Sequence, residues 1–145
     1  MSSGTILLVE DEALVAKMMM SAFAMWGFRA HHAANPTEAL LFAADHGRTI
    51  SFLICDVMLP EMHGSEVAER IRDLCPGLKT CFTSGYPLDI LSKLGALEPQ
   101  DLNDSVMFLQ KPFLPAVLRQ VIVQGAVAPE RAGQSFTERA YAAAS

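Results

Sequence analysis

Short apolar runs alternate with longer segments of helical periodicity along most of this chain. A continuous apolar run of four to six residues is typical of a strand that is covered on both faces. Strands are expected at residues 6–9, 28–33, 51–56, 78–83 and 106–109, and helices at 12–26, 36–46, 65–74, 88–94 and 113–124. This alternation predicts right-handed crossovers and a doubly wound α/β fold: a five-stranded parallel sheet with helices on both faces.

Helix boundaries carry local signals of their own. Asn35-Pro36-Thr37-Glu38 combines an N-cap residue, a proline at the first helical position and a glutamate that can reach back to the cap. Gly27, Gly47 and Gly125 stand where three helices are expected to end. Residues 95–104 are polar and contain Pro99, so the fourth helix is predicted to be short and its loop long.

Composition limits the function classes. With 145 residues, one domain (1–125) and a tail (126–145) too short for an output domain are expected. The chain is 51% hydrophobic and 19% charged, which is typical of a globular protein, and a net charge of -5 argues against direct nucleic-acid binding. No apolar stretch has the length of a membrane span or a signal sequence, so a cytoplasmic location is expected.

The cysteines and histidines predict no metal site. Cys55, Cys75 and Cys81 lack metal-ligand spacing and are interpreted as small buried hydrophobes in a reducing compartment. His31 and His32 are neighbours on a predicted strand, so they point to opposite faces and cannot share a metal ion.

Polar side chains follow four of the predicted strands. Glu10 and Asp11 follow the first, Asp56 ends the third, Thr83-Ser84 end the fourth, and Lys111 follows the fifth. The carboxyl ends of parallel strands meet at one edge of the sheet, where ligands bind next to the topological switch point. Three carboxylates, a hydroxyl and an ammonium are therefore expected to converge.

The chemistry of this set is coherent. Close carboxylates repel one another, and Mg²⁺ (or Mn²⁺) relieves the repulsion because it takes oxygen ligands while keeping several waters. A carboxylate screened in this way can attack a phosphoryl group and form an acyl phosphate. Lys111 would neutralise the developing charge, and the Thr83 hydroxyl would donate to a phosphoryl oxygen.

Each of these residues also has a simpler explanation. The acidic residues 10–12 would complement the dipole of a following helix, Thr83 could be a turn residue, and Lys111 a solvated charge. Asp56 is harder to explain in this way because it ends the purely apolar run 52–55.

Four motifs, in order along residues 5–124, resemble those of response-regulator receiver domains, and in particular receivers of hybrid histidine kinases. The motifs are Ile6–Glu12, Asp56–Pro60 with Met62 and Gly64, Phe82–Tyr86, and Leu109–Phe113. The resemblance implies a flavodoxin-like fold with strand order 2-1-3-4-5. It also implies that Asp56 is the phospho-acceptor.

Further roles are implied by the matching positions. Glu10 and Asp11 match the acidic pair of the family, with Asp11 and Asp56 as direct Mg²⁺ ligands. The backbone carbonyl of Met58 would be the third protein ligand.

The switch and phosphate-binding positions match as well. Thr83, with Ser84 beside it, matches the switch hydroxyl, and Lys111 the lysine that contacts the phosphoryl group. Phe108 matches an aromatic residue that turns inward when the threonine moves to the phosphate. The peptide bond before Pro112 is expected to be cis.

The predicted function is a signalling switch, not an enzyme. The chain would accept a phosphoryl group from a histidine kinase or histidine phosphotransfer protein and change its contacts with a downstream protein target, as a monomer or a weak phosphorylation-dependent dimer. A pseudo-receiver that only docks would be signalled by loss of Asp56, Asp11 or Lys111, and all three are present. A phosphatase resembling haloacid dehalogenases would need an aspartate at position 58, which is Met58.

Overall fold

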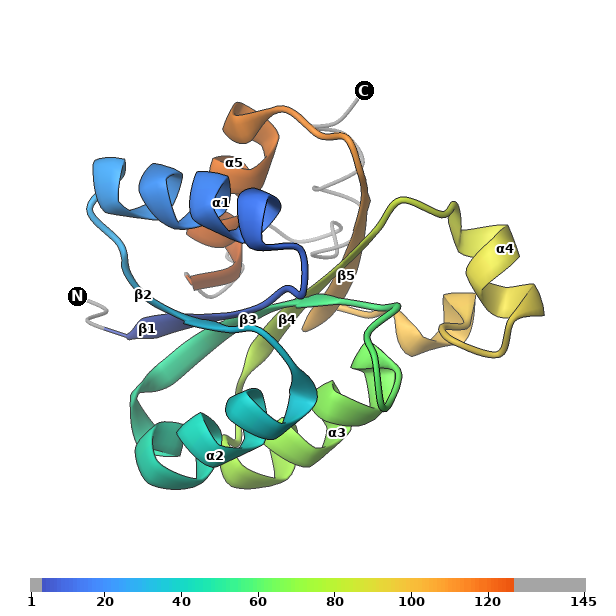
Figure 1. Cartoon of the computed structure of the whole chain (residues 1–145), viewed down its shortest axis with the longest axis horizontal. Coiled ribbons are helices and arrows are strands. Elements are labelled where there is room, and N and C mark those ends of the chain that lie inside the picture. The colour runs from blue at the N-terminus through green and yellow to red at the C-terminus, as the bar shows by residue number, and fades with distance from the viewer. Residues whose placement is uncertain (1–3, 127–145) are drawn as a thin grey trace.

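The computed structural model describes residues 4–126, in which the expected strands and helices alternate (Figure 1). The strands are β1 (Thr5–Val9), β2 (Arg29–Ala33), β3 (Ile50–Asp56), β4 (Lys79–Ser84) and β5 (Val106–Gln110). The helices are α1 (Ala13–Met25), α2 (Pro36–His46), α3 (Gly64–Leu74), α4 (Leu88–Lys93) and α5 (Pro115–Ala126), with short 3-10 turns η1 (Gly47–Thr49) and η2 (Pro99–Asp101). The predicted tail, apart from its first residue, lies outside the described residues.

The five strands form one parallel sheet in the order β2-β1-β3-β4-β5, as predicted. Helices α1 and α5 cover one face, and α2 and α3 cover the other (Figure 1). The chain leaves β1 toward β2 on one side and continues from β3 to β5 on the other, so the topological switch point lies between β1 and β3. The carboxyl ends of these two strands are therefore where a ligand site is expected.

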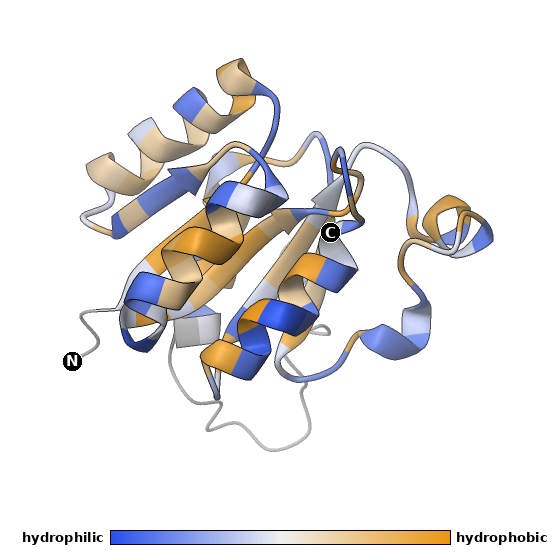
Figure 2. Ribbon diagram, turned by 60° about the horizontal axis from the view of Figure 1, so that its bottom comes forward, coloured by the Kyte–Doolittle hydropathy of each residue, from blue (hydrophilic) through white to orange (hydrophobic). Residues whose placement is uncertain are grey.

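One apolar cluster fills each side of the sheet. In β1, Leu7 and Val9 belong to the cluster under α2 and α3, while Ile6 and Leu8 belong to the cluster under α1 and α5. Because successive side chains alternate between faces, a strand covered on both sides must be apolar throughout. Figure 2 shows these apolar residues concentrated in the central strands.

The cap predicted for α2 is present. The backbone N–H of Glu38 donates to Asn35 Oδ1 at 2.9 Å, and Glu38 Oε1 accepts from the N–H of Ala34 at 2.9 Å. The first bond satisfies a donor that the helix itself leaves unpaired, and the second ties the helix to the residue before its cap.

The last helix differs from the sequence expectation. It begins at Pro115, not at Phe113, and Gly125 lies inside it instead of ending it. Phe113 and Leu114 belong to the loop after a cis Lys111–Pro112 peptide bond. Proline suits the first helical position because its missing N–H has no helical acceptor there, which accounts for the start at Pro115.

Helix α1 buries only part of its apolar face. It buries Ala16, Met19 and Phe23, but leaves Leu14 72% and Met18 66% exposed, although both are apolar positions of the helical period in residues 12–26. Along the part of the chain that the structure describes, no helix is long and apolar enough to cross a lipid bilayer.

Candidate functional site

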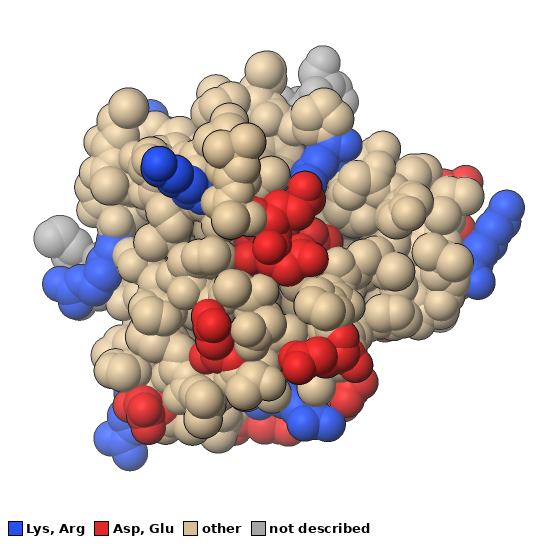
Figure 3. All heavy atoms as spheres, viewed as in Figure 1, with Lys and Arg blue, Asp and Glu red and all other residues tan. Residues whose placement is uncertain are grey.

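The carboxyl ends of β1 and β3 bring three acidic side chains together. Glu10 and Asp11 follow β1, and Asp56 is the last residue of β3; one carboxylate oxygen from each lies within 4.8 Å of the others. Figure 3 shows a compact group of acidic atoms near the middle of this face, with basic atoms beside it. The convergence predicted from the strand ends is thus present.

Lys111 joins this cluster from the loop after β5. Its Nζ donates to Glu10 Oε1 at 2.7 Å and to Asp56 Oδ2 at 3.1 Å, and lies 3.9 Å from Glu12 Oε1. The backbone N–H of Lys111 donates to the carbonyl oxygen of Ser84 at 2.8 Å, which holds the end of β5 against β4. One ammonium, from the loop after β5, thus contacts carboxylates at the ends of both β1 and β3.

In the ion pair of Glu10 and Lys111, burial shifts the pKa of each group in one direction and the charge of the partner shifts it in the other. Glu10 is 1% exposed, and burial raises the pKa of its carboxyl group, although the hydrogen bond and charge of Lys111 partly offset the effect. Burial alone would lower the pKa of Lys111, but the hydrogen bond to Glu10 and the charges of Asp56 and Glu10 raise it. The ammonium form is therefore favoured in the folded protein.

Asp56 is held at both carboxylate oxygens. Oδ2 accepts from Lys111, and Oδ1 accepts from the backbone N–H of Met58 at 3.2 Å. The next residue, Val57, donates its N–H to the carbonyl oxygen of Thr83 at 2.9 Å. The carboxylate therefore has a fixed direction at the end of β3.

Gly64 shapes the loop that follows Asp56. Its N–H donates to the carbonyl oxygen of Val57 at 2.7 Å, and a Cβ at this position would overlap the carbonyl oxygen of Asp56 and lie 3.0 Å from Val57 Cα. The start of α3 can approach the acidic residue this closely only with glycine at position 64. The motif included Gly64, but the sequence did not indicate this role.

Thr83 and Ser84 end β4 on the same edge of the sheet. Thr83 is 2% exposed and is the register partner of Asp56 across β3 and β4. The Ser84 hydroxyl instead accepts from the N–H of Tyr86 at 3.0 Å and closes the following turn.

Phe108 is buried on the α2 and α3 side of the sheet, where it is 5% exposed. The resemblance implied a ring that turns inward on phosphorylation. In this structure the ring lies inside the protein, because β5 and its neighbours enclose it in the apolar cluster.

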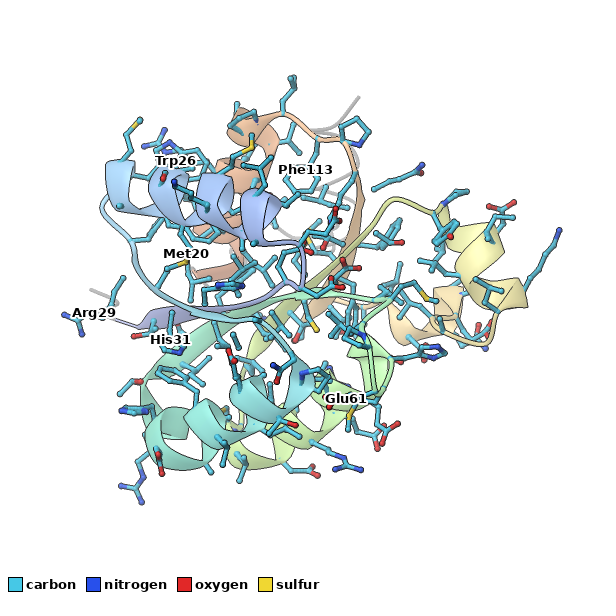
Figure 4. The ribbon with its side chains drawn as sticks, viewed as in Figure 1. Met20, Trp26, Arg29, His31, Glu61 and Phe113 are labelled. Atoms are coloured by element: carbon cyan, nitrogen blue, oxygen red, sulfur yellow. The ribbon has the colours of Figure 1, made fainter. Side chains whose placement is uncertain are left out.

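The two histidines of β2 point to opposite faces, as predicted. The ring of His31, which is labelled in Figure 4, stacks on Phe42 of α2 with a centroid distance of 3.9 Å. By contrast, His32 Nε2 lies 2.8 Å from the carbonyl oxygen of Glu10. His32 was not among the predicted site residues. Its register position opposite Leu8, two residues before Glu10, is the one signal that could have indicated it.

An apolar groove of about 290 Å³ adjoins the acidic cluster between α1 and the start of α5. Trp26 and Phe113, two of its lining residues, are labelled in Figure 4. Lys111 and Pro112 also line it, so the groove begins at the residue that contacts Glu10 and Asp56. The sequence did not predict this groove.

The site has the donor set of a hard divalent cation. Three carboxylates that converge within 4.8 Å supply oxygen ligands, which Mg²⁺ and Mn²⁺ prefer, and no thiol or imidazole belongs to the group among the described residues. Asp11 and Asp56 can reach a shared ion, and Lys111 contacts both Glu10 and Asp56 beside it. The residues present therefore fit such an ion.

Known proteins resemble this chain over most of the described residues. A sequence model of the response regulator receiver domain matches residues 6–123. The sensor kinase CckA of Brucella abortus (strain 2308) is 35% identical over 111 residues, which are 77% of this chain but 11% of the kinase. The response regulator receiver protein CpdR of the same strain is 30% identical over 109 residues, which are 74% of this chain and 84% of that protein.

Solved structures agree with this assignment. The receiver domain of the hybrid histidine kinase CckA matches with a TM-score of 0.71 and 28% identity, over 86% of this chain and all of that domain. A receiver protein of Sinorhizobium medicae WSM419 matches in fold with a TM-score of 0.73. The matched residues 6–123 include every strand end that supplies the acidic cluster and Lys111. The chain belongs to the response regulator receiver domain family of two-component signalling proteins.

Proposed function

We propose that this receiver accepts a phosphoryl group on Asp56, with Mg²⁺ or Mn²⁺ held by Asp11, Asp56 and the backbone carbonyl of Met58. Glu10 would complete the acidic pair beside the ion. The observation that supports this proposal is the contact of one ammonium with both Glu10 and Asp56, at 2.7 and 3.1 Å, beside Asp11, whose carboxylate has no hydrogen-bond or ion-pair partner among residues 4–126. Membership of the family implies phospho-acceptance in general. We propose in addition the acceptor residue, the metal ligands and the ion.

The reaction forms one bond and breaks one. A carboxylate oxygen of Asp56 attacks the phosphorus of a phosphohistidine, a P–O bond forms, and the P–N bond breaks with the imidazole as leaving group. A bound divalent ion would supply charge screening for the attacking carboxylate and for the phosphoryl oxygens. Lys111 holds Asp56 in place before transfer and can follow the negative charge onto the phosphoryl group, since its ammonium already lies 3.1 Å from Oδ2.

Thr83 and Phe108 are proposed to pass the change to the surface. Thr83 stands opposite Asp56 in the sheet register and Phe108 lies on the neighbouring strand, paired with Phe82. A Thr83 hydroxyl that moves to a phosphoryl oxygen would shift the end of β4, and with it Phe82, the partner of this buried ring. The proposed signal is therefore a repacking around Phe108, with the Ser84 turn following it.

The apolar groove supports a phosphodonor partner with an exposed apolar surface. A histidine kinase or histidine phosphotransfer protein must bring its imidazole within bonding distance of Asp56, so it must cover the surface beside Lys111. That surface includes the groove, which the exposed Met18 helps to line, and Leu14 on the same helix is a further exposed apolar side chain. Burial of such apolar surface contributes about 25 cal/mol per Å² and would stabilise the complex. A downstream protein target and a cytoplasmic location belong to the same proposal.

Phosphotransfer from a partner tests this function. A phosphorylated histidine phosphotransfer protein carrying ³²P is mixed with the receiver, and label is followed on a gel. Label should move to the wild type in Mg²⁺, and to Asp104→Asn, which changes an exposed acid away from the site. It should not move to Asp56→Asn, and transfer to that variant at the wild-type rate would contradict the proposal.

A further inference from the structure

We propose that His32 is a positioning residue for Asp11, acting through the peptide bond that joins Glu10 to Asp11. His32 Nε2 lies 2.8 Å from the carbonyl oxygen of Glu10. The acceptor is a carbonyl, so the ring nitrogen carries the hydrogen and donates it. The inference rests on the proposed role of Asp11 as a metal ligand.

Glu10 is held at every polar group. Its N–H donates to the carbonyl oxygen of Ala33 at 3.1 Å, Oε1 accepts from Lys111, and Oε2 accepts from the N–H of Glu12 at 3.2 Å. Strand β1 ends at Val9, so the Glu10 carbonyl has no further strand N–H to pair with. Within residues 4–126, the His32 ring is the partner that the structure gives this carbonyl. A carbonyl in a residue that is 1% exposed requires such a partner.

Asp11 is held in a different way. Its side chain is exposed, and none of the hydrogen bonds or ion pairs found among residues 4–126 involves its carboxylate. The direction of the carboxylate is therefore set by the backbone that carries it. The peptide unit between residues 10 and 11 is planar, so a bond to its oxygen also fixes the orientation of the Asp11 N–H and Cα. The octahedral geometry of Mg²⁺ tolerates little misplacement of a ligand.

His31 is a matched control on the same strand. It points to the opposite face, stacks on Phe42 at 3.9 Å and has no contact with Glu10 among the contacts found. A substitution at His31 also removes an imidazole ring from β2, as a substitution at His32 does, but it leaves the Glu10 carbonyl bonded. The two positions together separate a general effect on the strand from an effect on Asp11.

The test compares His32→Leu, His32→Gln and His31→Leu in the full chain. Leucine removes the donor, while the glutamine amide can place an N–H near the position of Nε2 without a ring charge. Mn²⁺ affinity is measured by electron paramagnetic resonance of the free ion, and the Asp11 amide is followed by ¹⁵N NMR in chelator. Loss of a supporting hydrogen bond around a metal site weakens metal binding about 10–100-fold. His32→Leu should fall near the lower end of that range, because the bond acts through the backbone.

We expect His32→Gln to bind Mn²⁺ with nearly wild-type affinity, and His31→Leu to match the wild type in both measurements. Only His32→Leu should shift the Asp11 amide strongly. If His32→Leu does not fold, His32→Asn replaces it, since its amide is one methylene too short to reach the carbonyl.

An unshifted Asp11 amide in the variant without the donor would overturn the inference, as would equal losses in His32→Leu and His32→Gln. The amide readout needs no metal. A wild type that fails to bind Mn²⁺ therefore contradicts the proposed metal site, while the amide shift still decides the role of His32.

Discussion

The Lys111 ammonium lies 2.7 Å from the Glu10 carboxylate, although 101 positions separate the two residues in the sequence. This ion pair connects the end of β1 to the loop after β5, and its acidic member is almost fully buried. Two elements at distant positions of the sheet are thus joined at the proposed site. Stability and function should therefore respond together to changes in this pair.

Replacing the ammonium tests the pair directly. Lys111→Met keeps most of the side-chain length but leaves Glu10 and Asp56 without their shared donor, so it should reduce the free energy of unfolding at pH 7 in chelator. The expected loss is about 1–3 kcal/mol, the usual penalty for a buried polar group left without its partner. Urea unfolding measures it, with Lys17→Met on the exposed side of α1 as control. A loss no larger than that of the control would show that the pair does not stabilise the fold.

Glu10 should make the stability of the metal-free protein depend on pH. Its pKa is raised by burial in the folded state, so between the ordinary glutamate pKa (about 4.3) and the raised value the folded protein binds more protons than the unfolded chain. The free energy of unfolding contributed by this group therefore falls as pH rises through that window. Urea unfolding in chelator at pH 4.5 to 8 measures the free energy of unfolding of the wild type and of Glu10→Gln. As pH rises, the wild type should lose stability relative to Glu10→Gln. A difference that stays constant, or that changes in the opposite direction, would refute the raised pKa of Glu10.

A divalent ion should stabilise the fold through Asp11. Mg²⁺ at a hundred times its Kd would add about 2.7 kcal/mol to the free energy of unfolding, because it binds the folded state alone. Asp11→Asn should raise Tm in chelator by relieving repulsion with Glu10 and Asp56, and should remove most of the rise that Mg²⁺ produces. Differential scanning fluorimetry with Mg²⁺ or chelator measures both effects, and Asp104→Asn should behave as the wild type. A full Mg²⁺ response in Asp11→Asn would argue against Asp11 as a ligand.

Gly64 should be intolerant of any side chain. A Cβ there overlaps the carbonyl oxygen of Asp56, so Gly64→Ala must displace either the start of α3 or the acidic residue. Such overpacking destabilises by about 1–3 kcal/mol, and phosphorylation should slow as Asp56 moves. Gly85→Ala is the matched control, because a Cβ at Gly85 meets nothing within 4 Å. Equal urea midpoints and equal phosphorylation rates in the two variants would show that the close approach is not needed.

Much of the fold could be predicted because its signals are local. The apolar runs identify strands covered on both faces, and Asn35 caps α2 with the bond that its sequence context indicates. Convergence of the acidic residues and Lys111 follows from parallel strands that end at one edge. These features depend on sequence spacing and on the rules of sheet topology.

The features that could not be predicted depend on tertiary contacts. Periodicity places Leu14 and Met18 on an apolar face but does not show that α5 and its loop leave them uncovered. Nothing local distinguishes His32, which bonds Glu10, from His31, which stacks on Phe42. The inward position of Phe108 likewise depends on the apolar cluster that surrounds it.

Phosphorylation of Asp56 is most directly tested by intact-mass spectrometry with a small-molecule phosphodonor such as acetyl phosphate. Wild type in Mg²⁺ should gain the mass of one phosphoryl group, and should not gain it in chelator. Asp56→Asn should gain none, while Asp104→Asn should gain it as the wild type does. A phosphorylated Asp56→Asn variant, or a folded wild type that stays unmodified in Mg²⁺ under these conditions, would contradict the assignment of Asp56 as the acceptor.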